Sequence, residues 1–76
     1  MFNELKKLIG ANNCASWMFM GCVGKSGKHD IKAYKHSGSR EYVNLSADGK
    51  AWCFDGRDSY LEIDLDTAKN TAMGKG

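Results

Sequence analysis

Apolar residues near the beginning of the chain recur at helical spacing. Phe2, Leu5, Leu8 and Ile9 are three or four positions apart, which is typical of one apolar stripe along an amphipathic helix. Gly10 follows the last of them, where a helix often ends on a residue with positive φ. The pattern therefore predicts a short N-terminal helix over residues 2–9.

Beyond residue 15 the apolar positions alternate instead, and glycine-rich turns interrupt them about every ten residues. The pattern predicts strands over residues 16–23, 29–36, 41–46, 51–54 and 60–65, followed by a helix over 67–73. Turns at this spacing are typical of an up-and-down meander. The predicted fold is a single α+β domain, residues 1–76, with an N-terminal helix, a five-stranded antiparallel meander that is curled or even barrel-like, and a short C-terminal helix.

Alternation also assigns side chains to the faces of this sheet. The inward set is predicted to be Ile31, Ala33, Val43, Leu45, Leu61, Ile63 and Leu65, and the outward set Lys32, Tyr34, His36, Tyr42, Asn44, Tyr60, Glu62 and Asp64. The pair Asp48-Gly49 lies between two predicted strands. It predicts a tight hairpin turn with positive φ at both residues.

The first predicted strand is apolar on both faces. Trp17, Phe19 and Val23 fall on one face, and Met18, Met20 and Cys22 fall on the other. Two short helices can cover only one face of a sheet, so the second apolar face needs a curled sheet, a second copy of the chain or a protein partner. We expect a homodimer that buries some of Trp17, Met18, Phe19, Met20 and Trp52.

Composition is that of a globular chain, with 42% hydrophobic and 26% charged residues and a net charge of +2. Charge is nevertheless segregated, because residues 25–40 are mostly basic and residues 41–66 mostly acidic. One interpretation is attraction between neighbouring strands. The other is a nucleic-acid-binding strand face, with lysines on phosphates and aromatic rings on bases, made of Lys32, Tyr34, Lys35, Arg40 and Tyr42.

Three observations bear on the compartment. No run of apolar residues reaches the roughly 18 needed to span a membrane. The first residues lack the charged-then-apolar layout of a secretory signal. Cys14, Cys22 and Cys53 are an odd set, which is simplest to explain as reduced thiols. The sequence therefore predicts a cytoplasmic protein that does not enter the membrane.

Motifs for chemistry are incomplete. Gly24-Lys25-Ser26 resembles the end of a phosphate-binding loop, but Phe19 stands where that motif needs its first glycine, so a hairpin turn is the better interpretation. Cys22 and His29 are placed to face each other across the first hairpin, but no compact ligand pairs exist. We expect no metal and no cofactor. Cys22 and Cys53 are predicted to be small core residues.

These observations favour a small non-enzymatic interaction or regulatory protein that acts by binding another protein. A nucleic-acid-binding module is the first alternative. A small thiol- or metal-dependent enzyme, using the cysteines and histidines, is the second.

Overall fold

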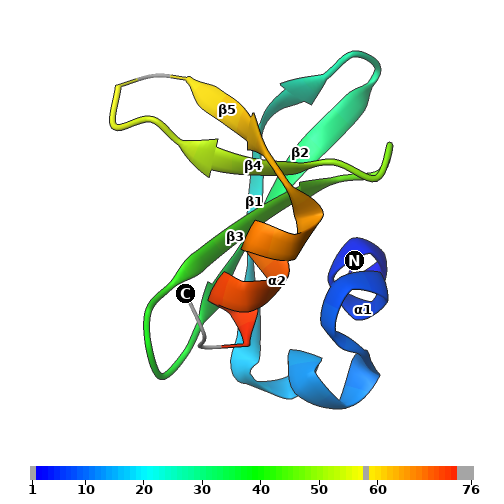
Figure 1. Ribbon diagram of the computed structural model, residues 1–76, viewed down its shortest axis with the longest axis vertical. Helices are drawn as coiled ribbons and strands as arrows, with labels where there is room; N and C mark the ends of the chain where they lie inside the picture. The colour runs from blue at the N-terminus through cyan, green and yellow to red at the C-terminus, as the bar shows by residue number, and fades with distance from the viewer. Residues whose placement is uncertain (1, 58, 74–76) are drawn as a thin grey trace.

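The computed structural model of the chain describes residues 2–57 and 59–73. Its elements are the helix α1 (Asn3–Ile9), the 3-10 helix η1 (Ala11–Ser16), the strands β1 (Trp17–Ser26), β2 (His29–His36), β3 (Tyr42–Ser46), β4 (Ala51–Phe54) and β5 (Tyr60–Ile63), and the helix α2 (Leu65–Ala72). The predicted α+β fold, with a helix at each end of a five-stranded antiparallel meander, is confirmed (Figure 1).

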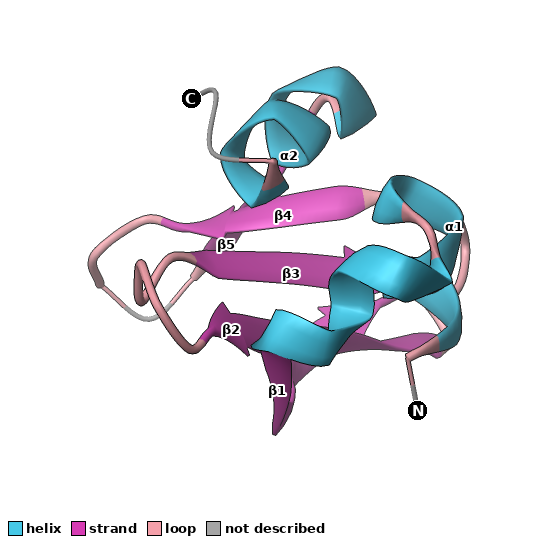
Figure 2. Ribbon diagram, turned by 90° about the horizontal axis from the view of Figure 1, so that it is seen from below, coloured by secondary structure: helices cyan, strands magenta, loops and turns pink. Residues whose placement is uncertain are grey.

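The five strands form one sheet in the order β1-β2-β3-β4-β5, and each strand pairs antiparallel with its neighbour in the chain. Both helices contact each other and lie against β3 (Figure 2). A sheet this small has two faces to cover, and the helices cover only one of them. The two faces are therefore buried by different means.

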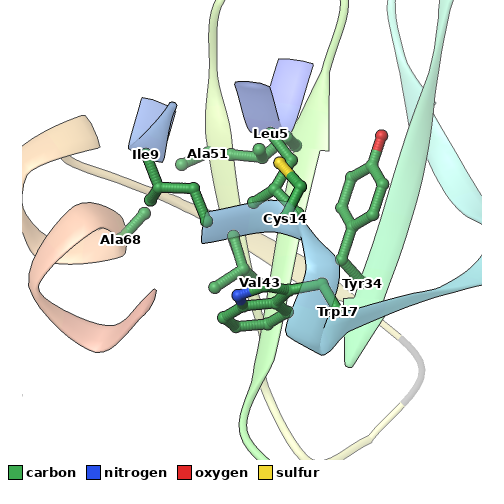
Figure 3. Close-up of a cluster of buried hydrophobic side chains, with 9 residues drawn as sticks. Leu5, Ile9, Cys14, Trp17, Tyr34, Val43, Ala51 and Ala68 are labelled. Carbon is green, nitrogen blue, oxygen red and sulfur yellow. The ribbon is translucent and has the colours of Figure 1, made fainter. Parts of the chain in front are cut away.

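The main core lies between the helices and the sheet (Figure 3). Its buried members come from every layer, and they are Leu5, Ile9, Cys14, Trp17, Tyr34, Val43, Leu45, Ala51 and Ala68. The predicted apolar stripe of α1 supplies Leu5 and Ile9. Each large aliphatic side chain removed from water in this way contributes roughly 1.5–3 kcal/mol to the free energy of unfolding.

The opposite face is concave, because the sheet curls strongly. Two irregularities in the β1–β2 register, after Phe19 and after Cys22, add twist, and Gly21 adopts φ 99° at the first of them. The curl brings β5 toward β1: a Cβ atom built on Gly24 would lie 4.0 Å from Cδ2 of Tyr60. The predicted curling is confirmed, but β1 and β5 do not pair, so the barrel-like alternative is not realised.

Several predicted orientations are wrong because β2 and β3 are covered on both faces. Tyr34 was assigned to the outward face, but it is 0% exposed and its ring packs 5.5 Å from that of Phe2 in front of α1. Asn44, also assigned outward, is buried on the concave face, where its Nδ2 donates a hydrogen bond to the Trp52 carbonyl. An alternating pattern divides the residues between two faces, but it does not show that both faces are buried.

Other residues were predicted to be buried and are exposed. Leu61 and Leu65 were predicted to point inward, but Leu61 is 59% exposed and Leu65 begins α2 at the surface. Cys22 and Cys53 were predicted to be core residues, and both are exposed, whereas Cys14 is buried. Leu61 and Cys22 lie on edge strands and Cys53 lies on the strand beside one, where the helices are too short to cover the sheet.

Some element boundaries also differ from the predicted ones. The first strand continues through Ser26, so the Gly24-Lys25-Ser26 segment is the end of β1 rather than a turn. Strand β5 ends two residues early and α2 starts at Leu65, because Asp64 already takes the N-cap position. The predicted stop of this helix at Gly74 lies outside the described residues.

The turn between β3 and β4 differs from the predicted tight hairpin. The Ser46 N–H donates to the carbonyl of Lys50, and the Gly49 N–H donates to the carbonyl of Ser46. Gly49 has φ 83°, whereas Asp48 has no positive φ. This is a three-residue loop that needs one left-handed residue rather than two.

Gly49→Val is expected to lower the free energy of unfolding by about 1–3 kcal/mol, because a β-branched residue is strained at positive φ. Ala47→Val, in the same exposed turn, is the matched control and should change stability by less than about 0.5 kcal/mol. Denaturant unfolding of the two variants measures the difference. Equal stability of both variants would show that the turn conformation is wrong.

Candidate functional site

The sheet splits between β3 and β4. Only two residue pairs join these strands, Asn44 with Trp52 and Leu45 with Ala51. Past Asn44 and Trp52 the strands diverge from their common turn, as Figure 1 shows for the green and yellow-green strands. Each strand remains paired on its other side, β3 with β2 and β4 with β5.

A groove of about 550 Å³ occupies this split. It lies between β3, the β4–β5 hairpin and α2, and its lining residues are Glu41, Tyr42, Val43, Asn44, Trp52, Cys53, Phe54, Tyr60, Ile63, Ala68 and Thr71. This volume is within the range of sites that bind small molecules or peptide side chains. A second pocket, between α1, the β3–β4 turn and Leu65, is smaller, with a volume of about 180 Å³.

Aromatic rings dominate one side of the groove. Tyr42 and Phe54 are 48% and 49% exposed, and together they form an apolar patch beside the groove, of the kind that often marks an interaction site. Phe54 packs against Tyr60 with ring centroids 5.3 Å apart, and the Lys35 Nζ lies 5.7 Å from the centroid of the Tyr42 ring. The rings are therefore held in place by neighbours while one face stays open.

A hydrogen-bond network fixes Trp52 at the closed end of the groove. The indole Nε1 donates to the Ser46 hydroxyl over 2.9 Å, and that hydroxyl donates to the Asp48 carboxylate. The Ser26 hydroxyl, from β1, donates to the other carboxylate oxygen over 2.6 Å. Hydrogen bonds from these two serine hydroxyls hold the pKa of Asp48 below its usual value, and the bond from Ser26 has the larger effect. The network ties β1 to the β3–β4 turn across the concave face.

The five residues predicted to bind nucleic acid do not form one face, although three of them lie close together. Lys32 forms an ion pair with Glu4 of α1 over 2.9 Å, in a partly buried position on the helix side. Tyr34 is in the core, where burial raises the pKa of its hydroxyl to about 12. Lys35, Arg40 and Tyr42 gather near the β2–β3 turn, and Arg40 occupies the turn itself with φ 64°.

The predicted interface residues also separate. Trp17 is buried in the core, and Phe19 and Trp52 are half-buried. Met18 and Met20 remain 43% and 47% exposed on β1, an edge strand of the sheet. Of the five predicted interface residues, these two methionines are the ones that present an exposed apolar side chain for a dimer to bury.

The cysteines and histidines do not form a reactive cluster. Cys22 is paired with Lys32 and His29 with Ser26, so the predicted juxtaposition of Cys22 and His29 is wrong. Among residues 2–57 and 59–73, no three His, Cys, Asp or Glu side chains are grouped as ligands of one metal ion would be. Within the same residues, no helix has the length and apolar character required to cross a bilayer.

Sequence reasoning did not identify Phe54, Tyr60 and Glu41 as parts of a site. One signal was present, because Trp52 and Phe54 alternate on the same face of a short strand. Their role as groove residues depends on the divergence of β3 and β4, which no local sequence pattern predicts.

Comparison with protein-family models, with curated proteins and with solved structures finds no match to this chain.

The lowered pKa of Asp48 predicts a pH-dependent stability. A carboxyl group whose pKa is lower in the folded state stabilises the fold above its unfolded pKa of about 3.9, and this contribution disappears as the pH falls through the lower folded pKa. Asp48→Asn should therefore be less stable than wild type at pH 7, and the difference should shrink from about pH 4 downward.

Thermal melts of both proteins between pH 7 and pH 2 measure this difference. Lys28→Ala, in the neighbouring β1–β2 turn, alters no carboxylate and should differ from wild type by a constant amount over the same range. A pH-independent gap between Asp48→Asn and wild type would contradict the assigned network.

Proposed function

We propose that this protein is a small non-enzymatic binding module that recognises a segment of another protein in the groove between β3 and β4. The observation that carries the proposal is the exposure of Tyr42 and Phe54 beside a groove of about 550 Å³. Aromatic rings that are held by neighbours and open on one face are typical anchors of protein recognition.

Charge favours a protein ligand over a nucleic acid. Among the described residues that line the groove, Glu41 alone carries a side chain that is charged at neutral pH. A phosphate backbone is attracted by lysine and arginine and repelled by a carboxylate. Lys32, which the nucleic-acid alternative requires, is engaged by Glu4. Binding to polyanions is therefore expected to be weak at physiological salt.

The proposal places this binding in a reducing compartment, the cytoplasm. Cys22 and Cys53 are exposed thiols, and Cys53 lines the groove itself. Exposed thiols persist where glutathione keeps them reduced. The proposed role is regulatory, in that the protein would hold and release a segment of its partner without forming a covalent bond.

Phe54→Ala is expected to weaken binding of groove-dependent peptides at least tenfold, which corresponds to about 1.4 kcal/mol. The peptides are selected from a displayed library of random nine-residue sequences against the full chain, and their affinities are measured by fluorescence anisotropy. The matched control is Leu61→Ala. Leu61 is 59% exposed on the same hairpin but does not line the groove.

Leu61→Ala should leave peptide affinity within twofold of wild type, and both variants should retain the wild-type fold because neither side chain belongs to the buried core. Equal losses in the two variants would contradict the assignment of the groove. Tight binding of a random oligonucleotide at 150 mM salt would favour the nucleic-acid alternative instead.

Self-association stays a prediction, and it is supported by Met18 and Met20 on the edge strand β1. Sedimentation equilibrium at micromolar concentration should give twice the chain mass of 8.4 kDa. The double substitution Met18→Ser, Met20→Ser removes apolar surface from the proposed interface and should restore 8.4 kDa. A wild-type mass of 8.4 kDa would contradict the dimer.

A further inference from the structure

The split between β3 and β4 exposes backbone polar groups as well as side chains. The Ser46–Lys50 hydrogen bond and the pairing of Asn44 with Trp52 show which residues of β3 and β4 point their backbone N–H and C=O groups toward each other. Residues whose N–H and C=O face the same neighbouring strand are two positions apart. The next such pair would be Tyr42 with Phe54, and this pair does not form.

The hydrogen bonds on the other side of each strand support this assignment of backbone directions. The His36 N–H donates to the Glu41 carbonyl, so odd-numbered residues of β3 direct their backbone groups toward β2. The Asp55 N–H donates to the Ser59 carbonyl, so odd-numbered residues of β4 direct theirs toward β5. The N–H and C=O groups of Tyr42 and Phe54 consequently face the groove, outside the β3–β4 ladder, and the Phe54 carbonyl accepts a long hydrogen bond from the Cys53 thiol, whose Sγ lies 3.6 Å away.

The groove has walls on both sides of the sheet. On the helix side it is lined by Val43 and Ala68, which are buried and apolar. On the concave side it is lined by the rings of Tyr42, Trp52 and Phe54. A strand inserted between β3 and β4 would direct successive side chains alternately to these two walls. A helix has no such two-sided pattern and leaves no backbone group free to pair.

We infer that the groove takes an extended peptide strand that pairs with the open backbone groups of Tyr42 and Phe54. This inference rests on the proposed function and names its ligand class. The strand carries an apolar side chain toward α2 and a lysine or arginine toward Glu41. The Glu41 carboxylate forms no ion pair among the described residues, and it is the one lining side chain among them that is charged at neutral pH. Recognition is thus strand addition inside a sheet rather than at its edge.

Backbone methylation of the bound peptide tests the pairing. The probes are the selected nine-residue peptides whose affinity depends on Phe54, each resynthesised with one N-methyl amide at a time. An inserted strand would pair with Tyr42 on one side and with Phe54 on the other, and its backbone groups point alternately to the two sides, so the two paired amides are adjacent or an odd number of residues apart. Methylation of these two amides should weaken binding at least tenfold, and methylation of the other amides should have less than a twofold effect. A side-chain-only mode of binding would show no amide with a tenfold effect.

Hydrogen exchange of the protein, followed by NMR, gives an independent readout. The amides of Tyr42 and Phe54 should exchange rapidly in the free chain and at least tenfold more slowly with peptide bound, whereas the Asn44 amide, already paired with β4, should change little. Unchanged exchange at Tyr42 and Phe54 with saturating peptide would overturn strand insertion.

The charge preference is tested at Glu41. Replacing the peptide's lysine or arginine by norleucine should weaken binding to wild type at least fivefold, but should have less than a twofold effect with Glu41→Gln. Asp66→Asn, an exposed carboxylate on α2 that does not line the groove, is the control and should behave as wild type. A norleucine effect that is the same with Glu41→Gln as with wild type would overturn the proposed cation contact.

These outcomes separate the two proposals. Peptides that need Phe54 but tolerate methylation at every amide would contradict strand insertion and leave groove recognition standing. Peptides that bind equally well to wild type and Phe54→Ala would contradict both.

Discussion

The structure depends on one constraint: a small sheet has two faces, and two short helices can cover only one. Leu5 and Ile9 of α1 and Ala68 of α2 fill the covered face. The other face is removed from water by curling, which needs the register irregularities in β1 and the positive φ of Gly21. On the concave side, the polar groups around Asp48 form hydrogen bonds with one another, so no layer of apolar side chains is needed there.

The same curl explains why the sheet divides. β1, β2 and β3 bend as one layer, while β4 and β5 follow the C-terminal helix, and the two parts stay joined only near the Asp48 turn. The side chains of Trp52 and Asn44 fill the junction. Beyond it nothing within the described chain bridges Tyr42 and Phe54, so the groove is a direct product of the way the second face is buried.

The sequence allowed the fold to be predicted well because every strand pairs with its neighbour in the chain, so local alternation and turns carry most of the information. It failed where burial depends on distant segments. Tyr34 was assigned outward because nothing near it in sequence indicates that Phe2 and α1 cover it. Leu61 was assigned inward because an alternating pattern does not show how far along the sheet the cover from α2 extends. The groove escaped prediction for a similar reason: its position depends on where β3 and β4 stop pairing.

The place of α1 in the chain has a consequence for biosynthesis. This helix has seven residues, well below the length at which an isolated helix is stable in water. It is synthesised before the segments whose side chains bury Leu5 and Ile9, which include Val43, Ala51 and Ala68. The hairpins need only short loops to close, so they form early. Helix α1 is therefore among the last of these elements to acquire its structure, and its apolar stripe stays accessible to chaperones until α2 has been synthesised.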